Sequence, residues 1–119
     1  MRKTLLAAIT APLLLLLAGG EAAAHAFLDH AEPAVGSTVA TPPTEVVLTF
    51  TRKLDPASCT IEITDAGGQR LDAAKPDVAG TVMRVALAAL PPGTYRVKWR
   101  VRSADGHVTD GAFTFQIRP

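Results

Sequence analysis

An all-β fold is the structure that this sequence predicts, an immunoglobulin-like Greek-key β-sandwich or barrel of about seven strands. Short runs rich in β-branched and aromatic residues recur along the chain, and turn-forming residues separate them. Apolar side chains alternate with polar ones at Val46, Leu48 and Phe50, and again over residues 95–101. No long segment keeps the period of about 3.6 residues that marks an amphipathic helix. Strands with one apolar face therefore account for the regular structure, and two half-buried sheets follow from them.

The strands follow one another at short intervals. Breaks rich in proline, glycine and aspartate fall at residues 33–37, 42–43, 55–56, 65–68 and 91–93. Residues 72–80 are the longest stretch without strand character, and we expect a surface loop with at most one helical turn there. The strands are expected at residues 26–30, 45–51, 60–64, 82–86, 93–101 and 111–117, with a weaker candidate at 69–71.

The first 24 residues have the layout of a secretory signal peptide. Two basic residues at positions 2 and 3 precede an apolar run over residues 5–18, and small residues follow. This run is shorter than the roughly 20 apolar residues of a membrane-spanning helix. Ala22 and Ala24 satisfy the rule for small residues before a cleavage point, so we expect cleavage after Ala24 and a periplasmic domain of residues 25–119 that begins with His25. A cut after Ala26 also satisfies the rule.

Charge and cysteine content narrow the possible functions. The chain has 12 basic and 11 acidic residues, and removal of residues 1–24 leaves ten of each. With this balance, and without a basic stripe or a basic cluster beside aromatic residues, nucleic acid is not an expected partner. About a hundred residues suit one small domain, which we expect to be a monomer. Cys59 is the single cysteine, so the chain forms no internal disulfide.

Three residues are candidate metal ligands: His25, Asp105 and His107. A histidine at a free amino terminus offers its α-amine and its ring Nδ1 as one chelate, and Cu(II) favours a tetragonal set of nitrogen and oxygen donors. Asp105 and His107 lie two positions apart, and Gly106 between them allows the backbone to bend and bring them closer. Met83 is the single methionine after residue 24, so a soft Cu(I) site is not indicated.

Two other functions fit the same residues. Asp105 and Gly106 form a common hairpin signal, so the segment is also interpretable as a plain turn of a metal-free sandwich module for adhesion or envelope assembly. An amino-terminal histidine with a second histidine also resembles the copper brace of enzymes that cleave polysaccharides oxidatively. A short chain with six aromatic residues, which mostly fit a core, leaves little surface for a sugar polymer, so we expect no enzymatic activity.

Two further residues carry reactive groups. His30 lies five positions after His25, and strand alternation predicts that it points to the opposite face, alongside Leu28, as a hydrogen-bonded structural histidine. Cys59 has no second cysteine or methionine near it in the sequence, and we expect a small, partly buried apolar residue.

The chain resembles the CopC family of periplasmic copper-resistance proteins over nearly all of residues 25–119. The resemblance rests on His25 directly after the cleavage point and on the pattern W-x-V-x-S-x-D-G-H-x-x-x-G-x-F-x-F, which begins at Trp99. It implies a seven-stranded barrel or sandwich that binds one Cu(II) ion through His25, Asp105 and His107. It also implies a role in copper carriage, buffering or resistance, with a CopD-type inner-membrane copper transporter as a possible partner. Some members carry a separate methionine-rich Cu(I) site, which this sequence lacks.

Overall fold

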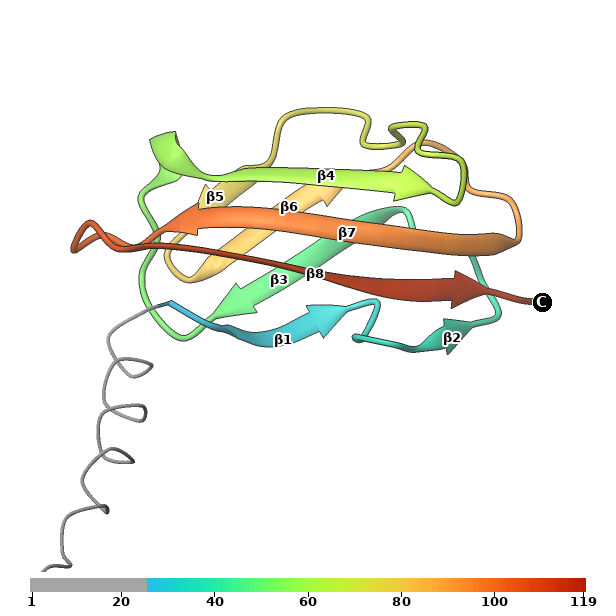
Figure 1. The fold of residues 1–119 in the computed structure, drawn as a ribbon, viewed down its shortest axis with the longest axis horizontal. Helices are drawn as coiled ribbons and strands as arrows, with labels where there is room; N and C mark the ends of the chain where they lie inside the picture. The colour runs from blue at the N-terminus through green and yellow to red at the C-terminus, as the bar shows by residue number, and fades with distance from the viewer. Residues whose placement is uncertain (1–25) are drawn as a thin grey trace, which may run out of the picture.

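Two four-stranded sheets pack face to face in the computed structural model, which describes residues 26–119 (Figure 1). The predicted signal peptide and His25 lie outside the described residues. The first sheet has the order β1-β3-β6-β5, and the second has the order β2-β8-β7-β4. The strands are β1 (Leu28–Glu32), β2 (Thr38–Val39), β3 (Glu45–Phe50), β4 (Thr60–Asp65), β5 (Asp77–Ala79), β6 (Val82–Ala86), β7 (Gly93–Arg102) and β8 (Val108–Ile117), and a single 3₁₀ turn spans Pro56–Ser58.

The connections between the strands are those of an immunoglobulin-type Greek key. If β1, β3, β4, β5, β6, β7 and β8 are named A to G in chain order, the sheets become A-B-E-D and G-F-C, the constant-type arrangement. The short β2 lies parallel to β8, so the first strand is divided between the two sheets, while all other pairs are antiparallel. The predicted fold class is confirmed.

Alternating side chains of both sheets form one core. Every second residue of β7 from Tyr95 to Val101 is buried, and the residues between them are exposed. The Trp99 ring meets Phe50 of the other sheet edge to face, at 5.1 Å between ring centroids. The Tyr95 hydroxyl donates a hydrogen bond to the carbonyl of Pro91, a contact typical of the tyrosine corner in such sandwiches. Burial raises the pKa of Tyr95.

Two short strands, β2 and β5, were not expected from the sequence. The prediction of a loop or helical turn over residues 72–80 is wrong at its end, because Asp77–Ala79 pairs with β6 as an edge strand. Gly80, at φ +63°, allows the tight reversal between these two strands. The weaker candidate at residues 69–71 forms only one bridge, between Thr64 and Arg70. Such short edge strands are too brief to show an alternating pattern.

The prediction that His30 lies alongside Leu28 is also wrong, while its position relative to His25 lies outside the described residues. The register between β1 and β3 shifts between Leu28 and His30, and this bulge breaks the alternation on which the prediction depended. Leu28 therefore packs against the core, while the exposed His30 places its Nε2 3.4 Å from a carboxylate oxygen of Glu32. Cys59 packs partly buried against the core, as expected, and burial raises the pKa of its thiol.

A row of basic side chains crosses the outer face of the second sheet. The alternation of β7 leaves four basic residues exposed on one side of the strand: Arg96, Lys98, Arg100 and Arg102. The expectation that the chain has no basic stripe is therefore wrong. Net charge gave no sign of it, because a strand gathers every second residue on one face whatever the overall balance.

Trp99 and Gly111 explain two positions of the sequence pattern. They are cross-strand partners in β7 and β8, and the indole lies over the glycine. A Cβ atom on Gly111 would lie 2.6 Å from Cζ2 of Trp99, closer than side-chain contacts permit. The indole is only 7% exposed, so it has little room to move away.

We expect Gly111→Ala to lower the free energy of unfolding by roughly 1–3 kcal/mol, because it overpacks the core at Trp99. Gly67→Ala is the matched control, since the nearest atom to its new Cβ is an Asp65 oxygen at 3.5 Å, an ordinary van der Waals distance. Urea denaturation followed by tryptophan fluorescence measures both variants. Equal stabilities would contradict the packing argument.

Candidate metal centre

The segment that connects β7 to β8 is a tight turn over residues 103–107. The Ser103 amide donates to the carbonyl of His107 at 2.8 Å, and the Gly106 amide donates to the carbonyl of Ser103 at 2.9 Å. Gly106 has a φ of +97°, a conformation that favours glycine. The interpretation of Asp105 and Gly106 as a hairpin turn is therefore correct, and so is the expectation that Gly106 bends the backbone.

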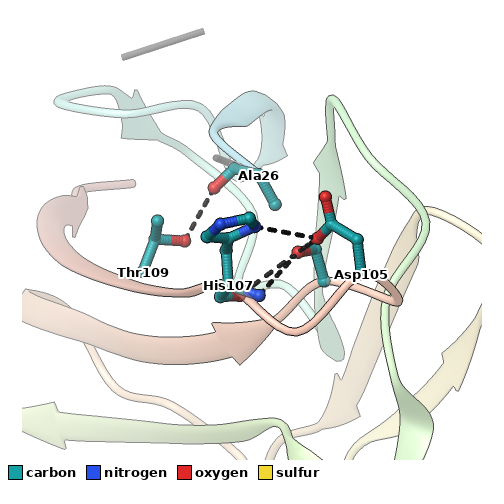
Figure 2. Close-up of polar contacts among 5 residues, drawn as sticks. Ala26, Asp105, His107 and Thr109 are labelled. Atoms are coloured by element: carbon teal, nitrogen blue, oxygen red, sulfur yellow. Dashed lines mark hydrogen bonds and ion pairs between the residues drawn. The ribbon is translucent and has the colours of Figure 1, made fainter. Parts of the chain in front are cut away.

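This turn brings the two predicted ligands of the loop together. Asp105 Oδ1 lies 3.2 Å from His107 Nδ1 (Figure 2). The side chains are 51% and 49% exposed, respectively, so both remain open to solvent. The turn thus presents one carboxylate and one imidazole side by side at an accessible end of the sandwich.

Ser103 supports this pair through hydrogen bonds from the buried side of the turn. It is 2% exposed and directly follows the end of β7, where it continues the inward alternation of Val97, Trp99 and Val101 that is otherwise apolar. Its hydroxyl donates a hydrogen bond to Asp105 Oδ1, and it accepts one from the His107 amide at 3.3 Å. Sequence reasoning gave this residue no role, although a serine at an apolar position of a strand was the available signal.

The same contacts control the charge of Asp105. The hydrogen bond from Ser103, followed by the one from His107, lowers the pKa of this carboxyl from 3.8 to about 2. Because the folded pKa lies below the ordinary value, ionised Asp105 favours the folded chain above about pH 4, and this contribution disappears as the pH falls towards 2. A permanent negative charge is therefore available beside His107 at neutral pH.

A second segment supports the turn from the side of β3. The carbonyl of Lys53 accepts a hydrogen bond from the Ala104 amide at 2.8 Å, and Leu54 forms an isolated bridge with Ser103. Arg52 and Lys53 line a small hollow together with Asp105. Backbone hydrogen bonds thus fix the turn on both sides, while two cations lie next to its carboxylate.

The start of the described chain lies at the same end of the sandwich (Figure 1). Ala26 is fully buried, and its carbonyl accepts a hydrogen bond from Thr109 Oγ1 at 2.7 Å (Figure 2). The amide of Phe27 donates to Thr51 Oγ1, and the Thr51 amide donates to the Phe27 carbonyl, both at 2.9 Å. Residue 26 is therefore anchored beside a strand residue two positions after His107.

Other potential ligands do not join this pair within residues 26–119. No group of three or more His, Cys, Asp or Glu side chains suited to a metal ion occurs in that range. Met83 is fully buried in the core.

None of the helices among these residues has the length and apolar character needed to cross a membrane.

Comparison with known proteins identifies related sequences. The family described as CopC domain matches residues 28–118. Protein YobA of Escherichia coli K12 is 34% identical over 99 residues, which cover 80% of this chain and 80% of that protein. Copper resistance protein C of Xanthomonas campestris pv. juglandis is 31% identical over 118 residues, which cover 86% and 87% of the two chains.

Solved structures extend the similarity to the fold. CopC from Methylosinus trichosporium OB3b superposes with a TM-score of 0.75 at 32% identity, over 80% of this chain and 95% of that one. PcoC, a methionine-rich copper resistance protein from Escherichia coli, superposes with a TM-score of 0.69 at 30% identity, over 79% and 99% of the two chains.

We expect Ser103→Ala to raise the pKa of Asp105 from about 2 towards 3.8, because it removes the first of the hydrogen bonds that lower it. The free energy of unfolding should fall by about 1 kcal/mol with the loss of this buried hydroxyl. A carboxyl carbon NMR titration measures the pKa. The control is Ser37→Ala, which removes a hydroxyl that bonds to the Ala34 carbonyl, away from this turn, and should leave the pKa of Asp105 unchanged. If Ser103→Ala also left the pKa of Asp105 unchanged, the proposed role of Ser103 would be wrong.

Proposed function

Because this chain belongs to the CopC family, we propose that it binds one Cu(II) ion in the periplasm and serves copper carriage, buffering or resistance. The observation that carries the proposal is the anchoring of Ala26 to Thr109, beside the turn that bears Asp105 and His107. Family membership also supports the expectation that the chain is not an enzyme.

The proposed site joins the turn to a new amino terminus. His25 is bonded to Ala26, and consecutive Cα atoms across a trans peptide are about 3.8 Å apart. A histidine tethered there can reach the neighbourhood of His107 without any rearrangement of the strands. Cleavage after Ala24 would free its α-amine, so amine and imidazole together would supply two nitrogen donors that Cu(II) prefers.

Asp105 and His107 would supply the remaining protein groups. The Asp105 carboxylate contacts Nδ1 of the His107 imidazole at 3.2 Å. Metal-binding histidines commonly hold one ring nitrogen against a carboxylate and bind the metal through the other. This contact supports a site in which His107 binds copper through Nε2 and Asp105 orients the ring and offsets the charge of the ion.

The methionine content supports a Cu(II) site without a Cu(I) site. PcoC is described as methionine rich, whereas Met83, the single methionine of residues 26–119, is buried in the core here. A soft thioether cluster therefore has no counterpart in this part of the chain. We further propose that the protein acts as a monomer and exchanges copper with a CopD-type inner-membrane transporter.

The first test compares two amino termini. We expect the intact mass of the exported protein to begin at His25, and we expect one extra residue before His25 to weaken Cu(II) binding at least about a hundredfold, because it converts the amine into an amide that is a poor ligand. Isothermal titration measures both affinities, and His107→Ala serves as the control that removes a ligand without changing the terminus.

Two results would contradict this site. Cleavage after Ala26 would remove His25 altogether. Unchanged affinity in the extended protein would show that the amine does not bind, and the metal-free interpretation of the turn would then be preferred.

Copper affinity should also fall as the pH decreases from 8 to 5. A terminal amine and an imidazole ordinarily have pKa values of about 7.7–8.0 and 6.5, and both must lose a proton to bind a metal. Asp105, with a pKa of about 2, stays ionised over this range and adds nothing to the change. We expect a decrease of at least about a hundredfold, measured by competition with a chelator of known affinity. A constant affinity would exclude protonatable nitrogen ligands.

A further inference from the structure

The outer face of the second sheet carries a line of positive charge that the metal site does not use. We name the exposed basic residues of β7 the β7 stripe: Arg96, Lys98, Arg100 and Arg102. From the first to the last, six residues of extended strand span about 20 Å. Within residues 26–119, none of the four side chains forms an ion pair or a hydrogen bond. These cations are therefore available to bind a partner.

Two carboxylates flank the stripe. Glu62 of β4 lies opposite Lys98, and Asp110 of β8 lies opposite Arg100. The face thus carries a local excess of positive charge on a chain whose residues 25–119 hold equal numbers of acidic and basic residues. Such an asymmetric charge distribution attracts an oppositely charged surface.

The stripe ends at the proposed metal site. Arg102 is the last residue of β7, and its guanidinium lies 3.7 Å from the position of a Cβ atom on Gly106 of the turn. Val108, directly opposite Arg102 in β8, is 45% exposed, and Phe27 at the same end is 41% exposed. Arginine beside exposed apolar and aromatic side chains is the composition of a protein interface.

We propose that the β7 stripe is the docking surface for an acidic protein that exchanges metal with this one. The metal exchange in this proposal rests on the proposed copper function, whereas the docking of an acidic protein does not. Glu62 and Asp110 favour an acidic protein over a nucleic acid or a membrane surface as the partner. A protein can place a hydrogen-bond donor against each of these carboxylates, whereas a continuous polyanion would repel them. Along the stripe from Arg96 to Arg100 no exposed aromatic side chain is available for base stacking, since the large aromatics exposed among residues 26–119 are limited to Phe27 near the chain start, at the Arg102 end.

The test uses the exported protein and a synthetic ten-residue peptide of alternating glutamate and threonine. At low ionic strength we expect the peptide to bind and to shift the backbone NMR signals of β7 and its neighbours. Arg96→Gln combined with Arg100→Gln should weaken binding by about tenfold, because steering by several charges acts together. Lys75→Gln combined with Arg84→Gln removes the same charge away from this face and should change the affinity less than about twofold.

Several outcomes would overturn the proposal. They are absence of peptide binding, equal weakening in both double variants, or stronger binding to anionic phospholipid vesicles or single-stranded DNA than to the peptide. Cu(II) titration of the same two variants keeps the two proposals separate. If Arg96→Gln with Arg100→Gln loses peptide binding but keeps its copper affinity, the stripe is supported as a docking surface. If the parent protein binds no copper, the copper function fails, and peptide binding alone decides whether the stripe is a docking surface.

Discussion

The register between β7 and β8 determines where Ser103, Asp105 and His107 of the candidate site lie. Ten residue pairs join these strands, and the contact of Trp99 with Gly111 permits no larger side chain at the glycine position. A shift by one residue would turn the indole outward and bring the charged face into the core. The same register places Ser103 in the inward position, from which its hydroxyl reaches Asp105 and the His107 amide. Core packing and site geometry are thus parts of one constraint.

The division of the first strand between the two sheets has a similar effect at the start of the chain. Because β1 pairs with β3 in one sheet, Ala26 enters the sandwich at the end where the β7–β8 turn closes the other sheet. The bond between Thr109 and the Ala26 carbonyl joins the two sheets at that point. The topology alone thus brings the start of the described chain and the β7–β8 turn, far apart in sequence, to the same end of the sandwich.

The sequence predicted the long strands, because β3 and β7 alternate over enough residues to reveal their apolar face. It did not predict β5, which has three residues, or the bulge that moves His30 out of phase with Leu28. The pair Asp105 and His107 was recognisable from its spacing around Gly106, but the supporting serine was not, since its role depends on burial. The β7 stripe was overlooked because net charge does not record the side of a strand on which charges lie.

The cations around the turn bear on what the proposed site is suited to do. Arg52 and Lys53 line a hollow with Asp105, and the Arg102 guanidinium lies beside Gly106. Positive charges near a cation site disfavour metal binding. Asp105 offsets part of this cost, but a site selected for affinity alone would not be surrounded by basic residues. Their presence is consistent with a benefit in the encounter with an acidic partner. The half-exposed side chains of Asp105 and His107 lie on a hydrogen-bonded turn, so a metal bound there as proposed would remain open to such a partner.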